Sequence, residues 1–418
     1  MEILSIGEKI KRSRIYKGFT LKEVCNEELS VSKLSCIENG KIKSDDNILK
    51  YIAKKLDIDF NYLKQDIRQQ LEAAVANFEK GYGNEKTFVH EIQYFINLSE
   101  ENQYYDLALR FIHFLFIYYL ENNNFNDLYS ITTKYYDFYQ KNSKEEITVI
   151  YYLDMAKYLF INNEFVQASA FFSDVKVLSK KINNMELYTI AIYNEAVCYY
   201  EINNFEKAYK LICNIENLIK YVKKDIDIAE IYRILAMLSI RLNREKFDYY
   251  KDLSYKYYEN DKKSKAVAMF KYAIPLFEIG EDELATYLVI DSLEIFPKED
   301  KKNLTEFMIE IVKVLIDNNS LNLGEEICQN ALNNSIEIDD IKLIERSYYF
   351  NAKILEIKKQ FSSAEMYMNL SLDFLVKFGD NKSISKRYFE MGYMYYNLGQ
   401  VNDALNFFNL AISIEKSI

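Results

Sequence analysis

The sequence is poor in residues that interrupt helices. It has 2 prolines and 10 glycines in 418 residues, and so few helix breakers over this length favour an almost entirely α-helical protein. Its five cysteines are odd in number and widely spaced: Cys25, Cys36, Cys198, Cys213 and Cys328. Because they form no CxxC pair and no Cys/His cluster, neither a disulfide framework nor a zinc site is expected, and we expect no metal and no cofactor.

Long apolar runs are also absent. The longest, Phe111–Leu120, includes His113 and is about half of what a membrane-spanning helix needs, and the first residues carry no apolar signal core. We therefore expect a cytoplasmic protein without a membrane partner. No phosphate loop, GxSxG, HExxH or paired-carboxylate motif stands out, and the only histidines are His90 and His113. Because no nucleophile–base pair is visible, we do not expect an enzyme.

A short theme repeats through residues 142–418. The last copy shows it best, with Tyr388, Gly392, Tyr395, Gly399 and Ala404 at fixed spacing. Its second small position recurs at intervals of 37 to 40 residues, at Ala168, Ala208, Asp248, Ala285, Gly324, Ala364 and Ala404. Such a period predicts about seven helix pairs stacked as a solenoid. The copies near Tyr232 and Met308 are degenerate, and Asp248 marks a place where irregular stacking or a hinge is expected.

The repeats resemble tetratricopeptide repeats lengthened from about 34 to about 40 residues. This resemblance implies a right-handed superhelical α-solenoid with a concave groove. Upstream, residues 67–141 are expected to form a linker helix and divergent helical repeats, because Phe125–Leu128 continues the register by one period. Residues 1–66 do not repeat and form a separate domain.

Charge divides the chain in the same way. Residues 1–70 hold 14 Lys and Arg against 11 Asp and Glu, a net charge of +3, so the remainder carries −13. A mildly basic head on an acidic body is compatible with DNA binding by the head alone.

The head has the pattern of five short helices. The first ends near Lys17–Gly18, and Thr20 with Glu23 forms a capping box for the second. Ser30 or Ser32 caps a third helix, and Asp45 and Asp59 begin the fourth and fifth. The order resembles the Xre/Cro-type helix-turn-helix domain, through Ile6-Gly7-x-x-Ile10, Gly18-Phe19-Thr20, Val31-Ser32-x-x-x-x-Ile37-Glu38-x-Gly40 and Leu49-x-x-Ile52-Ala53-x-x-Leu56.

This resemblance implies double-stranded DNA as a partner, with the helix Val31–Glu38 in the major groove. It implies that Ser32, Lys33 and Cys36 approach base edges, with Ser35 on the same helix, and that Thr20, Ser30, Lys41 and Lys43 meet phosphates. Two positions depart from the pattern. Leu21 stands where the family usually has Gln, and Cys36 stands where a long basic or amide side chain is common. Base readout would then rest on Lys33 and the serines, and each lysine has a plain alternative as a solvated surface charge.

The order of head and repeats resembles the RRNPP family (Rap, Rgg, NprR, PlcR and PrgX) of Gram-positive regulators. The resemblance implies a transcription factor that is a homodimer through its repeats, binds an inverted-repeat operator and carries a short signalling peptide in its groove. Counting positions on the first helix of each repeat gives the residues expected to contact that peptide: Lys157, Tyr193, Asn194, Tyr200, Arg233, Met237, Arg241, Phe270, Lys271, Phe277, Lys313 and Lys353. The same count also places Asp154, Glu201, Tyr349, Phe350, Tyr393, Tyr396 and Asn397 on the groove side.

Asn194 is the foremost candidate, because an amide can hold peptide backbone with two hydrogen bonds, and Arg233 with Arg241 could clamp a carboxylate. Plainer alternatives stay open: the aromatics as packing residues, Asn194 as a solvated or capping group, and the arginines as partners of Glu230 or Glu201. The alternative function is a Rap-like adaptor, in which the repeats sequester a response regulator or another protein. The acidic body and the weakened third helix of the head favour that alternative.

Overall fold

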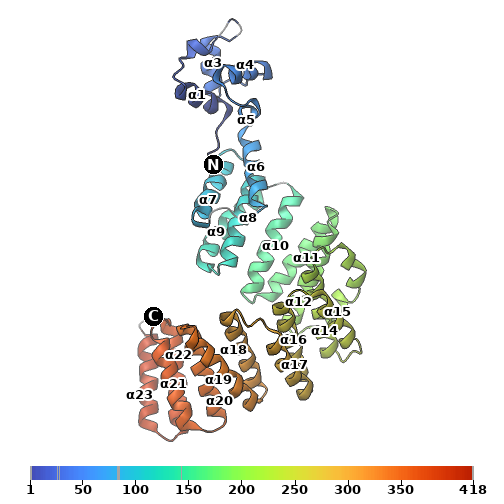
Figure 1. The fold of residues 1–418 in the computed structure, drawn as a ribbon, viewed down its shortest axis with the longest axis vertical. Coiled ribbons are helices and arrows are strands. Elements are labelled where there is room, and N and C mark those ends of the chain that lie inside the picture. Colours follow the sequence, from blue (N-terminus) through green and yellow to red (C-terminus); the bar gives the residue numbers. More distant parts are fainter. Residues whose placement is uncertain (1, 26, 28, 82–84, 143, 417–418) are drawn as a thin grey trace. The chain divides into compact units, whose positions relative to one another are not determined.

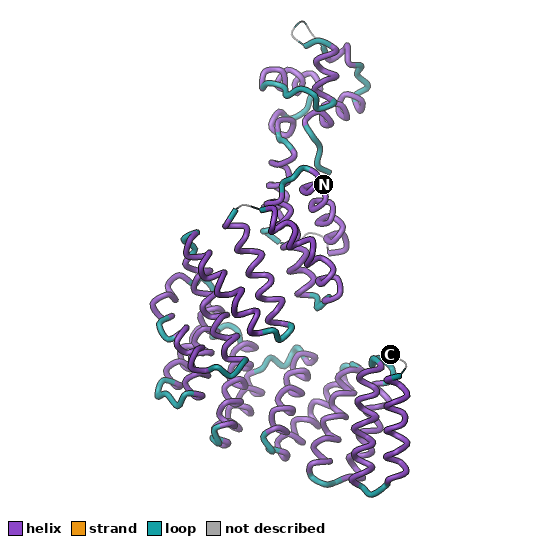
Figure 2. Tube along the Cα trace, turned by 180° about the vertical axis from the view of Figure 1, so that it is seen from behind, coloured by secondary structure: helices purple, strands orange, loops and turns teal. Residues whose placement is uncertain are grey.

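The computed structural model describes residues 2–25, 27, 29–81, 85–142 and 144–416, with the backbone alone for residues 85 and 86. Within those residues the chain is helical and contains no β-strand (Figures 1 and 2). It divides into two compact units, Met1–Asn203 and Asn204–Ile418. The all-α prediction is therefore confirmed, and the domain boundaries at residues 66 and 141 stay predictions.

The first unit begins with five short helices around one small core. They are α1 (Ile6–Tyr16), α2 (Leu21–Val24), α3 (Val31–Glu38), α4 (Asp46–Leu56) and α5 (Phe60–Lys64). Ser5 and Thr20 each form a complete capping box, with Glu8 and Glu23 respectively. Buried side chains at helical spacing, including Ile10, Leu34, Ile52 and Leu56, close the core. We call residues 5–65 the head.

Seven longer helices complete the first unit. They are α6 (Ile67–Phe78), α7 (Glu85–Glu101), α8 (Tyr105–Glu121), α9 (Phe125–Lys141), α10 (Glu145–Ile161), α11 (Phe165–Lys181) and α12 (Met185–Glu201). Aromatic rings fill much of the core between α7 and α9, where Phe95 stacks on Phe111 with ring centroids 5.2 Å apart and Tyr135 and Phe138 are fully buried. Such rings each bury a large apolar area, which stabilises the packing of these helices.

The second unit continues the alternation of helices and turns. Its elements are α13 (Phe205–Ile212), the 3-10 helix η1 (Ile215–Tyr221), α14 (Asp225–Arg241), α15 (Phe247–Tyr257), α16 (Lys262–Glu278), α17 (Asp282–Ile295), α18 (Lys301–Asp317), α19 (Leu321–Glu337), α20 (Ile341–Ile357), α21 (Phe361–Leu375), α22 (Asn381–Asn397) and α23 (Val401–Glu415). Within the unit, α14 pairs with α15, α16 with α17, α18 with α19, α20 with α21 and α22 with α23.

The turn after the first helix of each repeat has a left-handed residue, most often asparagine or glycine. The helices α8, α10, α12, α14, α16, α18, α20 and α22 are all 17 residues long. Two residues after each of them the backbone turns left-handed, at Asn123, Asn163, Asn203, Asn243, Gly280, Asn319, Lys359 and Gly399. Asn and Gly tolerate this conformation better than other residues, so they end one helix and allow the next to turn back beside it.

The repeating small residues lie in buried positions near the start of the second helices. Ala168, Ala285, Ala364 and Ala404 are at most 1% exposed. A small side chain at such a crossing lets two helix backbones approach closely, while bulkier neighbours fill the space on either side. The predicted repeat is confirmed as a series of helix pairs.

The assignment of Asp248 to this small-residue position is wrong. Asp248 is exposed and pairs with Lys251 on the surface of α15, with 2.6 Å between Lys251 Nζ and Asp248 Oδ1. The turn from α14 to α15 spans five residues, whereas the turn from α10 to α11 spans three. The two extra residues move the equivalent position to Tyr250, which is 1% exposed.

The close crossings predict opposite outcomes for two glycines within helices. A side chain at Gly392 would collide with the ring of Phe408, whereas one at Gly324 would make ordinary contacts at 3.6 Å with Leu315 and 3.7 Å with Ile354. Replacing a helical Gly by Ala gains about 1 kcal/mol of helix propensity, and overpacking costs about 1–3 kcal/mol. We expect Gly324→Ala to raise or preserve the free energy of unfolding and Gly392→Ala to lower it, as measured by urea denaturation followed by circular dichroism. Equal changes in the free energy of unfolding for the two substitutions would contradict the closer helix crossing at Gly392.

Candidate functional site

The orientation of α3 in the head is fixed by its buried side. Leu34 and Ile37 are 0% and 3% exposed, and Glu38 is 6% exposed at the end of the same face. Since these side chains point inward, the opposite side of the helix must face solvent. The buried side chains of α3 therefore fix its orientation in the head and leave one face of the helix toward solvent.

An ion pair between α1 and α3 holds this arrangement. The guanidinium of Arg14 meets the carboxylate of Glu38 with two bonds, Nε to Oε1 at 2.6 Å and Nη2 to Oε2 at 2.9 Å. Arg14 also donates to the carbonyl of Phe19, just before α2, at 2.9 Å. A bidentate, nearly buried pair of this kind is geometrically specific, and removing one partner would leave an uncompensated charge. One side chain therefore positions α3, α1 and the entry to α2 together.

Close backbone contact adds to the ion pair. A side chain at Gly7 on α1 would collide with the backbone carbonyls of Ile37 and Glu38 at the end of α3. The glycine in the Ile6-Gly7 pattern is thus explained by the close approach of two helices.

Lys9 of α1 fixes the end of α5 in a similar way. Its ammonium group donates to the carbonyls of Tyr62 and Gln65 at 2.7 and 2.8 Å, and it lies 4.4 Å from the centre of the Tyr62 ring. The side chain is 1% exposed, and burial lowers the pKa of Lys9 to about 8. The carbonyls at the end of α5 are satisfied by this lysine instead of by water.

The residues predicted to meet DNA are exposed or half-buried in the head. Thr20, Ser30, Ser32, Lys41 and Lys43 are exposed, and Lys33, Ser35 and Cys36 are half-buried. Ser30 caps α3 by accepting from the backbone N–H of Lys33 at 3.2 Å, as Thr20 caps α2. Sequence reasoning did not single out Val31, which stands at the first position of α3 with 43% of its surface exposed. Its place directly after a capping serine was a signal that could have been used.

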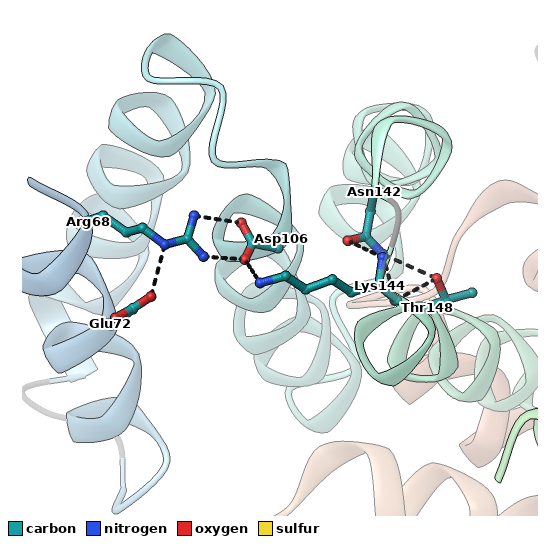
Figure 3. A network of polar contacts seen from close by, with 6 residues as sticks. All are labelled: Arg68, Glu72, Asp106, Asn142, Lys144 and Thr148. Atoms are coloured by element: carbon teal, nitrogen blue, oxygen red, sulfur yellow. Dashed lines mark hydrogen bonds and ion pairs between the residues drawn. The ribbon is translucent and has the colours of Figure 1, made fainter. Parts of the chain in front are cut away.

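A charge cluster in the first unit joins the helix after the head to the repeats (Figure 3). Asp106 at the start of α8 accepts from Arg68 of α6 and from Lys144, which precedes α10, each at 2.5 Å. Burial by itself raises the pKa of Asp106, but the hydrogen bonds from Arg68 and Lys144 outweigh it and leave the net pKa below its ordinary value. One carboxylate thereby holds three segments that are far apart in the sequence.

The second candidate surface is the stripe of predicted groove-side residues on the first helices of the repeats, taken in each unit by itself. Lys271 and Lys313 are exposed, and Lys157, Tyr193, Asn194, Arg233, Arg241 and Lys353 are half-buried. Their role in peptide binding stays a prediction.

Five residues counted onto the groove side are instead in the core. Tyr200, Met237, Phe270 and Phe277 are between 5% and 8% exposed, and Asp154 is 0% exposed. Phe270 packs edge-to-face on Phe307 with centroids 5.6 Å apart. For these aromatics the packing alternative holds, because a bulky ring next to the stripe turns toward the neighbouring helix.

The two arginines of the predicted carboxylate clamp already have partners. Arg233 pairs with Glu230 on the same helix, and Glu230 also accepts from the hydroxyl of Tyr258. Arg241 pairs with Glu278 of α16 and lies 5.0 Å from the centre of the Phe205 ring. A peptide carboxylate would have to exchange with these glutamates, so binding there would replace one ion pair by another.

A buried polar cluster in the first unit was also missed. His113 of α8 and Tyr135 of α9 both bond the same oxygen of Asp154 of α10, each at 2.6 Å. The other carboxylate oxygen is buried without a hydrogen-bond partner, and burial first, then Asp154, raise the pKa of Tyr135 well above its ordinary value. His113 is thus a partner of a buried carboxylate, and the cluster joins three consecutive helices.

Neither a metal site nor a membrane span is found in the part of the chain that the structure describes. No group of three or more His, Cys, Asp or Glu side chains there is arranged to hold a metal ion. None of the described helices is long and apolar enough to cross a bilayer.

Comparison with known proteins adds to the description of the repeats. No protein-family model matches the chain. A TPR repeat-containing protein of Methanocaldococcus jannaschii is 25% identical over 297 residues, which cover 56% of this chain and 51% of that protein. The chain therefore spans about half the length of the curated relative it matches.

Solved structures of helical-repeat proteins are also similar. The apo quorum sensor NprR from B. thuringiensis is 14% identical and covers 84% of this chain and 100% of its own, with a TM-score of 0.46. PlcR from Bacillus thuringiensis, in complex with the peptide PapR7 and DNA, is 16% identical over 61% of this chain and 94% of its own, with a TM-score of 0.35. A Rap protein complexed with competence and sporulation factor is 12% identical over 84% and 98%, with a TM-score of 0.47. These neighbours belong to the RRNPP family, and at such scores the likeness is one of helical architecture.

The pKa of Lys9 makes the stability of the first unit depend on pH in alkaline solution. Between about pH 8 and the ordinary value of 10.5, the unfolded chain binds a proton at Lys9 that the folded head does not. The free energy of unfolding therefore gains a contribution that rises with pH across this window, up to about 3 kcal/mol. We expect the free energy of unfolding of the wild type, minus that of Lys9→Met, to increase with pH when both are measured by urea denaturation from pH 7.5 to 10.5. Tyrosine titration is common to both proteins and cancels, and a difference that is flat with pH would show that Lys9 is not desolvated.

Proposed function

We propose that the protein is a cytoplasmic transcriptional regulator that binds DNA through the head and is controlled by a short signalling peptide on its repeats. The observation that carries this proposal is the outward face of α3, which begins at a capped N-terminus and takes little part in the head's core. A helix held in this way, next to a second short helix, is what insertion into the major groove requires. The +3 charge of residues 1–70 supports approach to phosphates.

The repeats are the proposed receptor for the peptide. In each unit the predicted stripe on the first helices carries polar or charged side chains, with Tyr193 and Asn194 in the first unit and Lys271 and Lys313 in the second. Such groups suit an extended peptide, whose backbone needs hydrogen-bond partners and whose side chains need both apolar and charged neighbours. A peptide bound to this stripe would favour one of two placements of the DNA-binding heads. The size of the shift is set by the difference between the peptide's affinities for the two placements.

A homodimer through the repeat domain belongs to the same proposal, and an inverted-repeat operator would mirror its twofold symmetry. Its support is the last helix, α23, where Val401, Leu405 and Ile412 are 52%, 53% and 42% exposed along one side. An exposed apolar stripe on one side of a helix is a natural surface for a second copy.

DNA binding is tested by fluorescence anisotropy of the full-length protein with a duplex from the region upstream of its own gene. We expect tighter binding than to a scrambled duplex of equal length. Ser32→Ala and Lys33→Ala should each lose about 1–3 kcal/mol of that discrimination if the side chain contacts a base. Lys180→Ala, which removes an exposed lysine from α11, is the matched control and should bind as the wild type does.

Equal and weak affinity for both duplexes would contradict the proposal. It would favour the Rap-like adaptor, whose acidic repeats sequester another protein. That alternative predicts a stoichiometric protein partner, retained from cytosol in a pull-down whether or not DNA is present.

Peptide binding is tested by selecting ligands for the full-length protein from a synthetic library of short linear peptides. We expect Asn194→Ala to weaken binding of the selected peptides by about 1–3 kcal/mol, the usual cost of leaving a polar partner unpaired. Asn330→Ala, which removes an exposed amide from the second helix α19, should leave affinity unchanged. Equal affinities of the wild type and Asn194→Ala would remove Asn194 from the site.

A further inference from the structure

The outward face of α3 has an unusual chemistry for reading bases. Its exposed or half-buried residues are Val31, Ser32, Lys33, Ser35 and Cys36, and the exposed Asn39 follows as the helix cap. No arginine or glutamine is present among them. Arg or Lys is the usual reader of guanine and Asn or Gln the usual reader of adenine, so most of the long polar readers are missing.

The amide that remains is already engaged. The side-chain nitrogen of Asn39 donates to the carbonyl of Ser35 at 2.8 Å, which folds the side chain back on the end of its own helix. This bond uses one of the two N–H donors of the amide and turns the side chain toward its own helix, so Asn39 would have to reorient to make the two-point contact that identifies adenine. Lys33 is then the single long side chain on this face.

Val31 offers the remaining specific contact. It is an apolar residue with 43% of its surface exposed, whereas Leu34 and Ile37 on the same helix are 0% and 3% exposed. Its position is the first residue of α3, and the N-terminal residues of a recognition helix are those that reach base edges. The one apolar group that the major groove presents is the C5-methyl of thymine.

We propose that Val31 packs against a thymine methyl group and that the protein therefore prefers operators with thymine at the contacted position. This inference rests on the proposed DNA-binding function. Burial of both apolar groups removes them from water, and the serine hydroxyls beside Val31 accept or donate without distinguishing bases sharply. Thymine at this position would then carry a large share of the sequence preference.

The test begins with selection of bound duplexes from a random-sequence library by the full-length protein. Each thymine of the selected duplex is then replaced singly by deoxyuridine, which keeps base pairing and deletes only the methyl group. One replacement should weaken wild-type binding about fourfold, the factor that corresponds to ~0.8 kcal/mol for a buried methyl group. Val31→Ala should bind the thymine and uracil duplexes equally. Val166→Ala, at a valine that is 64% exposed on α11, should keep the wild-type preference.

The outcomes separate this inference from the function beneath it. If a sequence is enriched but no uracil replacement matters, or if Val31→Ala keeps the preference for thymine, the role of Val31 is overturned and DNA binding stands. If the protein enriches no sequence above the starting library, the proposed function itself is overturned, and the role of Val31 with it. Circular dichroism of Val31→Ala confirms that the head is folded before binding is compared.

Discussion

Close approach of helix backbones is the constraint on which the rest of the molecule depends. In the repeats, buried residues such as Ala168 and Ala404 let paired helices cross closely, and in the head Gly7 does the same against the end of α3. The core on either side is then filled by large aromatic and aliphatic groups, at a density that leaves little freedom to shift. Surfaces for ligands therefore lie on rigid helices, whose outward faces are set by what they bury.

Charge pairing determines which ligand groups those surfaces can bind. The head buries one ion pair, Arg14 with Glu38, which orients α3, and carries exposed pairs such as Lys17 with Asp57. In the repeats, Arg233 and Arg241 are already paired with Glu230 and Glu278. A ligand on the repeats would thus gain by exchanging ion pairs, whereas DNA at the head would gain from phosphate contacts and from the shape and methyl contacts of α3.

Much of this arrangement could be predicted from the sequence, because it depends on local rules. Small residues at a fixed period predicted the helix pairs, and residues such as Thr20 and Asp45 predicted the starts of helices in the head. Three features could not be predicted in this way. Two extra turn residues displaced Asp248 from the crossing, and a fixed period does not reveal such a change in turn length. Phe270 turned toward Phe307 and Asp154 met His113 inside the core, and both depend on contacts between distant residues. Spacing along one helix does not reveal which neighbouring helix a side chain will meet.

The central claim is that the face of α3 is where this chain meets DNA. The most direct measurement is hydrogen–deuterium exchange of the full-length protein with and without a duplex enriched from a random-sequence library, followed by mass spectrometry. The account predicts slower exchange on DNA binding in residues 17–21 and 29–43, which include the starts of α2 and α3 and the loop that carries Lys41 and Lys43. Protection confined to the repeats, with exchange in residues 29–43 unchanged while DNA is bound, would contradict it.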